Sequence, residues 1–234
     1  MCEVLAVAWD QPERFDRVLP WAWELERLGV AGFGWGAAWL GEDGAVEAYR
    51  RPTSLRDDPE GRERLARVTS RRFLVHLRRP SRLSTVQMAD TQPFLAEGGR
   101  FAFCHNGMLE RHEDHRDRLG ASLSGKADSE IGFRMTEEAI AGGAAPADAL
   151  ADVYGRLGGR ANFGILDADG TLAVFAANAT NHMWTFELDG ARVASTALHS
   201  DDQSVFGMLF DRAEGAEPVE GAAVVAAPLT SGRI

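Results

Sequence analysis

The sequence predicts an α+β domain, in which antiparallel sheets are covered by helices. Strand-like segments gather at the two ends of the chain, and segments with helical spacing lie in its middle. The composition agrees with this class, because 234 residues with 45% hydrophobic and 26% charged side chains are typical of one globular domain. We find no internal repeat, low-complexity block or long linker, and we expect residues 1–234 to form a single domain.

The N-terminal part of the chain is expected to alternate strands and helices. An apolar, β-rich run begins at Cys2, and the next apolar residues recur at helical spacing until Gly29, with Pro20 disturbing the pattern. A Glu42-Asp43-Gly44 turn favours a hairpin. The predicted elements are strands 2–9, 32–40, 45–50 and 72–77, and helices 15–28 and 59–68.

The rest of the chain is expected to hold two helices and a series of short strands. Asp128 is a candidate N-cap for a helix through Ile140, which Gly142-Gly143 would end. Pro146 stands near the start of the next helix, which is a favoured place for proline. The predicted elements are helices 128–140 and 146–157, and strands 101–105, 162–166, 171–176, 183–188, 192–195 and 222–226.

Charge and composition exclude several classes of partner. The net charge of −10 argues against nucleic acid, which requires a basic face. No apolar run is long enough to cross a bilayer, so we expect no membrane partner, and the N-terminus lacks the basic region of a signal peptide. The two cysteines, Cys2 and Cys104, form no disulfide framework or zinc pattern, which fits a cytoplasmic protein.

Cys2 is the first candidate for catalysis. Removal of Met1 would leave a thiol and a free α-amine on one residue. An α-amine has a pKa of roughly 7.7–8.0 and a thiol one of roughly 8.5, so one residue can supply both base and nucleophile near neutral pH. Taken alone, a cysteine at position 2 is more often an accident of sequence.

The pair Asn106-Gly107, at the end of a predicted strand, has two interpretations. Asn-Gly usually marks a hairpin turn. It could instead form an oxyanion hole from the Asn106 side-chain amide and the Gly107 backbone N–H, donors that each lower the barrier to acyl transfer by roughly 3–4 kcal/mol.

Two further segments carry charged residues suited to an amino-acid substrate. Arg78 lies in His76-Leu77-Arg78-Arg79-Pro80-Ser81, and a guanidinium can bind a carboxylate with two hydrogen bonds. Asp128 lies in Ala127-Asp128-Ser129-Glu130 and could bind an ammonium group. The alternatives are a surface arginine and a simple helix cap.

In this order the segments resemble the class-II glutamine amidotransferases, of the compact stand-alone type within the N-terminal-nucleophile hydrolases. The resemblance spans nearly the whole chain. The matching segments are Cys2, the glycine-rich 32–36, His76 to Ser81, Asp90 to Phe94, Phe103 to Gly107, Ala127 to Glu130 and 193–197.

This resemblance implies a fold and a set of roles. The fold is a four-layer αββα sandwich of two antiparallel sheets. Cys2 is implied as nucleophile and base, Asn106 and Gly107 as the oxyanion hole, and Arg78 and Asp128 as ligands of the substrate α-carboxylate and α-ammonium. Ser81 belongs to the substrate-binding segment, and Trp35 is expected to form a wall of the pocket. No cofactor and no metal is implied.

The chain departs from the family pattern at several positions. Asp90 stands where asparagine is usual, Arg79 and Pro80 replace neutral residues, and Ala127 replaces a hydroxyl residue. None of them is the nucleophile or an oxyanion donor, so the reaction class is kept, and the departures argue against ordinary glutamine as the substrate.

Other candidate residues have plainer explanations. The segment 110–115 holds two histidines among carboxylates and could bind a metal, although such charged runs usually form a solvated helix face. Cys104 is expected to be an inert core thiol and His76 a structural histidine.

The leading hypothesis is hydrolysis of the side-chain amide of glutamine, or of a γ-glutamyl amide, through a thioester. A separate synthase subunit is the expected ammonia acceptor. One alternative is a hydrolase of a larger γ-glutamyl conjugate without ammonia transfer. Another is a catalytically silent relative that serves as a binding or assembly subunit.

Overall fold

The computed structural model describes residues 2–29, 31–198 and 203–229, and it contains two antiparallel sheets packed face to face. Within these residues the larger sheet has the strand order β11-β9-β10-β1-β4-β2-β3. Its strands are β1 (Glu3–Arg14), β2 (Trp35–Leu40), β3 (Val46–Arg51), β4 (Thr69–Leu77), β9 (Met183–Leu188), β10 (Ala191–Thr196) and β11 (Glu214–Pro218).

The smaller sheet has the order β12-β8-β7-β6-β5 in the same described residues. Its strands are β5 (Phe94–Leu95), β6 (Phe101–Leu109), β7 (Gly159–Asp167), β8 (Leu172–Ala177) and β12 (Gly221–Ala226). The helices are α1 (Leu19–Gly29), α2 (Pro59–Ala66), α3 (Glu113–Leu119), α4 (Asp128–Ala141), α5 (Pro146–Leu157) and α6 (Gln203–Leu209).

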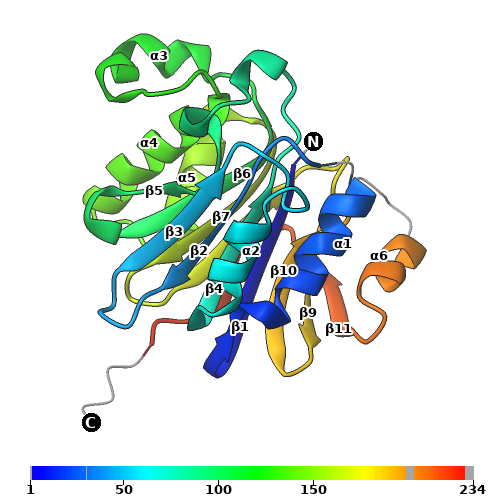
Figure 1. Ribbon diagram of the computed structural model, residues 1–234. Helices are drawn as coiled ribbons and strands as arrows, with labels where there is room; N and C mark the ends of the chain where they lie inside the picture. Colours follow the sequence, from blue (N-terminus) through cyan, green and yellow to red (C-terminus); the bar gives the residue numbers. More distant parts are fainter. Residues whose placement is uncertain (1, 30, 199–202, 230–234) are drawn as a thin grey trace.

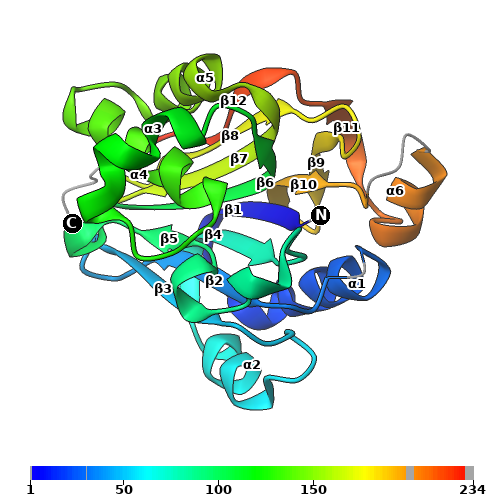
Figure 2. The ribbon, with the colours of Figure 1, turned by 90° about the horizontal axis from the view of Figure 1, so that it is seen from above.

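Three apolar clusters define four layers. Alternation along β1 sends Val4 and Ala6 into the cluster between the two sheets, and Leu5 and Val7 into the cluster beneath α1 and α2. A third cluster joins the smaller sheet to α4 and α5. Figure 2 shows α4 and α5 on one side of the paired sheets and α1 and α2 on the other. The predicted four-layer αββα sandwich is confirmed.

The chain begins at the middle of this architecture. β1 pairs with β10 on one side and β4 on the other, so the residue before Glu3 lies at the end of a central strand (Figure 1). Because β1 is buried from Glu3 to Trp9, its position is fixed by the core on both of its faces. The N-terminal end of β1 is therefore held rigidly at the rim of the sandwich.

Several local predictions were confirmed and others were wrong. The strands and helices expected from sequence are present with shifted bounds, and the helix expected over 15–28 begins only at Leu19, because Pro20 suits a first turn and not a helix interior. The hairpin interpretation of Asn106-Gly107 was wrong: β6 continues through both residues and pairs with β7 as far as Leu109. The prediction that Asp128 caps a helix was also wrong, since Ala127 is the N-cap and makes no side-chain cap hydrogen bond.

No described helix combines the length and apolar character needed to span a membrane.

Candidate active site

Cys2 lies on the wall of a cavity of about 620 Å³ at the end of β1. Its thiol rests against the backbone of Arg79, whose N–H lies 3.4 Å from Sγ and whose carbonyl oxygen lies 3.7 Å from it. Burial raises the pKa of the Cys2 thiol, and the Arg79 N–H and the nearby Arg78 charge oppose that rise. The nucleophile predicted from the sequence is thus a half-buried thiol that faces a cavity.

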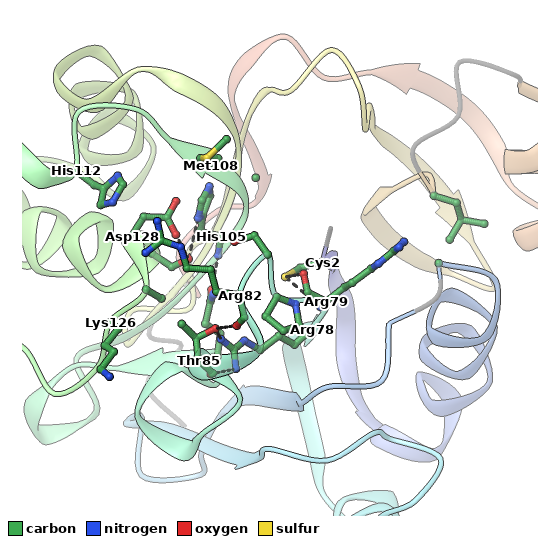
Figure 3. Close-up of a pocket in the computed structure, with 18 of the residues that line it drawn as sticks. Cys2, Arg78, Arg79, Arg82, Thr85, His105, Met108, His112, Lys126 and Asp128 are labelled. Carbon is green, nitrogen blue, oxygen red and sulfur yellow. Dashed lines mark hydrogen bonds between the residues drawn. The ribbon is translucent and has the colours of Figure 1, made fainter.

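The cavity is built by segments far apart in sequence. The turn after β4 contributes Arg78 to Arg82 and Thr85, β6 contributes His105, Gly107 and Met108, and the start of α4 contributes Asp128 and Ser129. Figure 3 shows these segments around Cys2. A cavity of this size is within the range of small-molecule sites.

Arg78 is held with its charge beside the cavity. Its side chain is 3% exposed and donates through Nη1 to the Thr85 carbonyl and through Nη2 to Thr85 Oγ1 at 2.8 Å. Burial lowers the pKa of Arg78, while Cys2, Asp90 and Asp128 raise it. A guanidinium has five N–H donors, so those not bound to Thr85 remain for a substrate anion.

Asp128 opens α4 and also anchors β6. Its Oδ2 accepts a hydrogen bond of 2.8 Å from the Leu109 N–H, which ties the helix start to the strand that carries Asn106 and Gly107. Asp128 lines the same cavity as Cys2 and Arg78 (Figure 3). A carboxylate in this place can bind an ammonium group with its remaining lone pairs.

Asp90 explains one departure from the family pattern. Its Oδ1 accepts from the backbone N–H groups of Lys126 at 2.7 Å and Ala127 at 2.8 Å. Its Oδ2 accepts from Gln87 Nε2 at 2.7 Å. A carboxylate only accepts hydrogen bonds, so it receives all three of these donors at once, whereas an asparagine would fit only with the Gln87 amide turned over. Asp90 therefore fixes the segment that leads into Asp128.

Asn106 lies directly beside Cys2. Its Nδ2 donates a short hydrogen bond to the Cys2 carbonyl oxygen, and its Oδ1 accepts from Asn162 Nδ2 at 3.0 Å and Asn178 Nδ2 at 3.2 Å. An amide nitrogen carries two N–H groups, so one remains after the bond to Cys2. The donors around Oδ1 set the orientation of the amide, with its nitrogen toward Cys2.

This asparagine cluster was missed in the sequence. Asn162 is fully buried in β7 opposite Asn106, and Asn181 Nδ2 approaches both Asn106 Oδ1 and the Cys2 carbonyl oxygen at 3.5 Å. The available signal was a polar side chain inside a strand whose other central residues are apolar. Such a buried amide requires partners, but the sequence does not show which ones.

Gly107 occupies a position that only glycine tolerates. Its φ is +137°, and a Cβ would lie 1.8 Å from the Arg160 carbonyl oxygen. The N–H groups of His105 and Leu109 turn away from β7 to Gln92 Oε1 and Asp128 Oδ2. Because N–H direction alternates along a strand, the Gly107 N–H between them lies on the same edge of β6, which borders the cavity.

Of the remaining two predicted site residues, Ser81 lies at the cavity and Trp35 does not. Ser81 is exposed and lines the cavity. The prediction that Trp35 forms a wall of the pocket was wrong. Trp35 is fully buried beneath the outer face of the larger sheet, where its Nε1 donates to Asp58 Oδ2 at 3.0 Å and its ring packs on Tyr49.

The other candidate residues, His76 and Cys104, are buried away from the cavity. His76 Nε2 lies 3.2 Å from the His105 carbonyl oxygen between the sheets, and burial lowers the pKa of His76 to about 3, so the ring is neutral. Cys104 is fully buried, and burial raises the pKa of its thiol. The described residues include no group of three or more histidine, cysteine, aspartate or glutamate side chains arranged for a metal ion.

Comparisons with known proteins agree with the family resemblance and the fold. The family model described as "Glutamine amidotransferases class-II" matches residues 1–232. Among solved structures, the glutamine phosphoribosylpyrophosphate amidotransferase of B. subtilis superposes with a TM-score of 0.71 at 15% identity over 95% of this chain, which spans 47% of that enzyme. A glutamine aminotransferase class-II domain protein from Silicibacter pomeroyi gives a TM-score of 0.61 at 19% identity over 95% of this chain and 98% of that one. No curated protein matches the sequence.

Proposed function

The chain belongs to the class-II glutamine amidotransferases, and we propose that it hydrolyses the side-chain amide of glutamine or of a γ-glutamyl compound with Cys2 as nucleophile. The chain covers about half of the B. subtilis enzyme, so the whole reaction of that enzyme is not carried over. We further propose that residues 1–234 act as one amidohydrolase domain.

One observation carries the proposal. The Cys2 thiol, the Gly107 backbone, the Arg78 guanidinium and the Asp128 carboxylate all line a single cavity. Asn106 is fully buried beside the cavity lining and contacts the carbonyl oxygen of Cys2 through Nδ2. A nucleophile, oxyanion donors and a pair of opposite charges are the groups that acyl transfer from an amino-acid amide requires.

The first half of the reaction forms a thioester. With Met1 removed, the Cys2 α-amine takes the thiol proton, and Sγ attacks the side-chain carbonyl carbon of the substrate. The carbonyl oxygen becomes an oxyanion that accepts hydrogen bonds from the free Asn106 Nδ2 N–H and the Gly107 N–H. The C–N bond then breaks as the protonated α-amine of Cys2 gives its proton to the leaving nitrogen.

The second half regenerates the enzyme. The α-amine of Cys2 accepts a proton from water, and the resulting hydroxide attacks the thioester carbonyl carbon. The C–S bond then breaks, and the α-amine of Cys2 returns the proton to the Cys2 sulfur. The products are glutamate and ammonia, or glutamate and an amine when the substrate is a conjugate. Ammonia transfer to a separate synthase subunit stays a prediction from the sequence.

The binding residues set the substrate class. Arg78 and Asp128 carry opposite charges in one cavity, and buried charge is costly unless it is paired. An α-amino acid supplies both complements. The side-chain amide of such a ligand extends from these two residues to Cys2.

A glutamate-release assay tests this proposal. The protein would be produced with its N-terminus defined by intact mass, and L-glutamine and γ-glutamyl amides would be offered to the form that begins at Cys2. We expect glutamate release from at least one of them and none from Cys2→Ala. Release that is undiminished in Cys2→Ala would contradict Cys2 as the nucleophile. No release from the processed protein with any compound would support the alternative of a silent binding subunit.

A further inference from the structure

The cavity has a second cationic region that the amino-acid part of the substrate does not use. Among the residues that the structure describes, the cavity is lined by four cationic side chains, those of Arg78, Arg79, Arg82 and Lys126, and by one carboxylate, that of Asp128, although the whole chain has a net charge of −10. Arg78 and Asp128 suffice for an α-carboxylate and an α-ammonium. The other cations are available for a further anionic group.

Arg79 differs from the rest in its position. In Figure 3 the side chain of Arg79 extends away from Cys2 on the side opposite Asp128 and the guanidinium of Arg78, whereas Arg82 lies on the Asp128 side. Gly29 and Leu198 also line the cavity, and Gly29 ends α1, which packs on the larger sheet. Asp128, by contrast, begins α4 on the smaller sheet. The residues that line the cavity thus lie on two sides of the Cys2 thiol, which we call its two arms.

The chemistry of the amide assigns the two arms. In a γ-glutamyl amide the acyl chain and the leaving nitrogen lie on opposite sides of the carbonyl carbon that the thiol attacks. With the α-amino and α-carboxylate groups at Asp128 and Arg78, the leaving amine points to the arm of Arg79. Free glutamine would leave this arm empty, because its leaving group is ammonia.

Arg79 is exposed and forms no ion pair among the described residues. Its backbone is held against the Cys2 thiol, so the side chain starts within contact of the reacting atoms. Two apolar side chains, those of Leu28 and Leu198, also line the cavity. An arginine at the rim of an apolar surface can bind an anion and discriminate between ligands by charge.

We propose that Arg79 and the adjoining wall of Leu28, Gly29 and Leu198 form a leaving-group subsite, and that the substrate is a γ-glutamyl amide whose amine carries an anionic group. This inference rests on the proposed hydrolysis and specifies its substrate. The anionic group is a carboxylate or a phosphate, which share this recognition chemistry.

A matched series of substrates tests the subsite. γ-Glutamylglycine and γ-glutamylglycinamide have nearly the same shape and differ in one negative charge, so the ratio of their kcat/KM values measures recognition of that charge. We expect the wild type to favour γ-glutamylglycine by about fivefold, the upper range for one exposed ion pair, and to lose the preference at high salt. The γ-glutamyl derivative of aminomethylphosphonate distinguishes a phosphate-like group from a carboxylate: whichever of the two is turned over better identifies the anion.

Variants locate the effect. Arg79→Gln should bring the ratio to about one while its backbone contact to Cys2 is kept. Arg82→Gln, on the other arm, should leave the ratio unchanged, and Arg67→Gln on the exposed end of α2 should change neither the ratio nor the activity.

The outcomes separate the two proposals. If the wild type hydrolyses glycine and glycinamide compounds equally well, or if Arg79→Gln retains the preference, the subsite is wrong and the hydrolysis stands. If the protein that begins at Cys2 releases glutamate from L-glutamine but from none of these compounds, only the subsite is wrong. If it hydrolyses neither L-glutamine nor these compounds, both proposals are wrong.

Discussion

Asn162 Nδ2 donates a hydrogen bond of 3.0 Å to Asn106 Oδ1, across the β6–β7 pair. The same nitrogen also donates to the Asn181 carbonyl at 2.7 Å. Because Oδ1 is surrounded by donors, the Asn106 amide cannot turn over without loss of these bonds, and its nitrogen stays toward Cys2. We therefore assign Asn162 a positioning role for the proposed oxyanion donor.

Replacing Asn162 should affect the transition state more than binding. Asn162→Ala removes the shortest of the hydrogen bonds that hold Asn106 Oδ1 and so loosens the orientation of the amide, and we expect kcat to fall by about tenfold with little change in KM. Asn106→Ala removes the donor itself and should lower kcat by about 10²–10³. Steady-state kinetics of the two variants measures both effects. A rise in KM with normal kcat for either variant would mean that the asparagine binds substrate instead.

Asp128 and Arg78 should determine binding of the α-amino and α-carboxylate groups. In Asp128→Asn the amide oxygen can still accept from the Leu109 N–H, so the fold is retained while the charge is lost. We expect KM to rise by about 10- to 100-fold with a smaller change in kcat, since a hydrogen bond to a charged group is worth about 1.5–3 kcal/mol.

Arg78→Lys should act in the same direction, because lysine lacks the planar guanidinium that makes two bonds to Thr85 and keeps further N–H groups for a carboxylate. Kinetics on any γ-glutamyl substrate measures both variants, and a substrate that lacks the α-amino group provides the control. Normal KM in Asp128→Asn, or efficient turnover of that control, would remove these residues from the site.

Gly107→Ala should unfold the rim of the site. The methyl group would meet the Arg160 carbonyl oxygen at a backbone φ of +137°, so β6 or β7 must move. We expect a loss of at least about 2 kcal/mol of unfolding free energy together with loss of activity. Gly155→Ala is the matched control, because nothing lies within 4 Å of its Cβ in α5 and alanine favours a helix. Equal stabilities of the two variants would contradict the model of Gly107.

Glu3 should make stability depend on pH. It is fully buried in β1 next to Cys2, and this burial raises its pKa from 4.5 to about 7, against the hydrogen bonds from Thr196 Oγ1 and Asn181 Nδ2. Below pH 4.5 the carboxyl is neutral in both the folded and the unfolded chain. As the pH rises to about 7, the unfolded chain ionises first, and the folded protein loses about 3 kcal/mol of relative stability.

Glu3→Gln is neutral at every pH and should not show this loss. Urea unfolding of wild type and variant between pH 4.5 and 8 measures the difference, which should move in favour of the variant as the pH rises. Glu63 forms an exposed ion pair with Arg67, and Glu63→Gln is the control. Its difference in stability from the wild type should change little with pH. Parallel pH profiles for Glu3→Gln and wild type would contradict the assignment.

The sequence predicted the fold class and the segments of the site because both depend on local patterns. Alternating and helical spacing marked most elements, and Cys2, Arg78, Gly107 and Asp128 stood in recognisable segments that the fold brings to one cavity. Trp35 was misplaced, because a glycine-rich strand does not show which face its aromatic residue takes. Here that face is the outer one, where Asp58 accepts from the indole.

Other features depend on contacts that no local pattern contains. The asparagines that hold Asn106 come from β7 and from the segment after β8, which are distant in sequence and meet only when the smaller sheet forms. Asp128 was expected to cap its own helix, but its carboxylate bonds to the backbone of β6. In both cases the partner of a buried polar group is decided by tertiary packing.

The identity of the nucleophile is the central claim, and covalent labelling tests it most directly. The processed protein would be treated with a glutamine-like diazo-ketone and its peptides examined by mass spectrometry. We expect one adduct per chain, on Cys2, with none in Cys2→Ala, because Cys104 is fully buried and its thiol pKa is raised. An adduct on Cys104, or a processed wild type that stays unlabelled while it hydrolyses γ-glutamyl amides, would contradict the account.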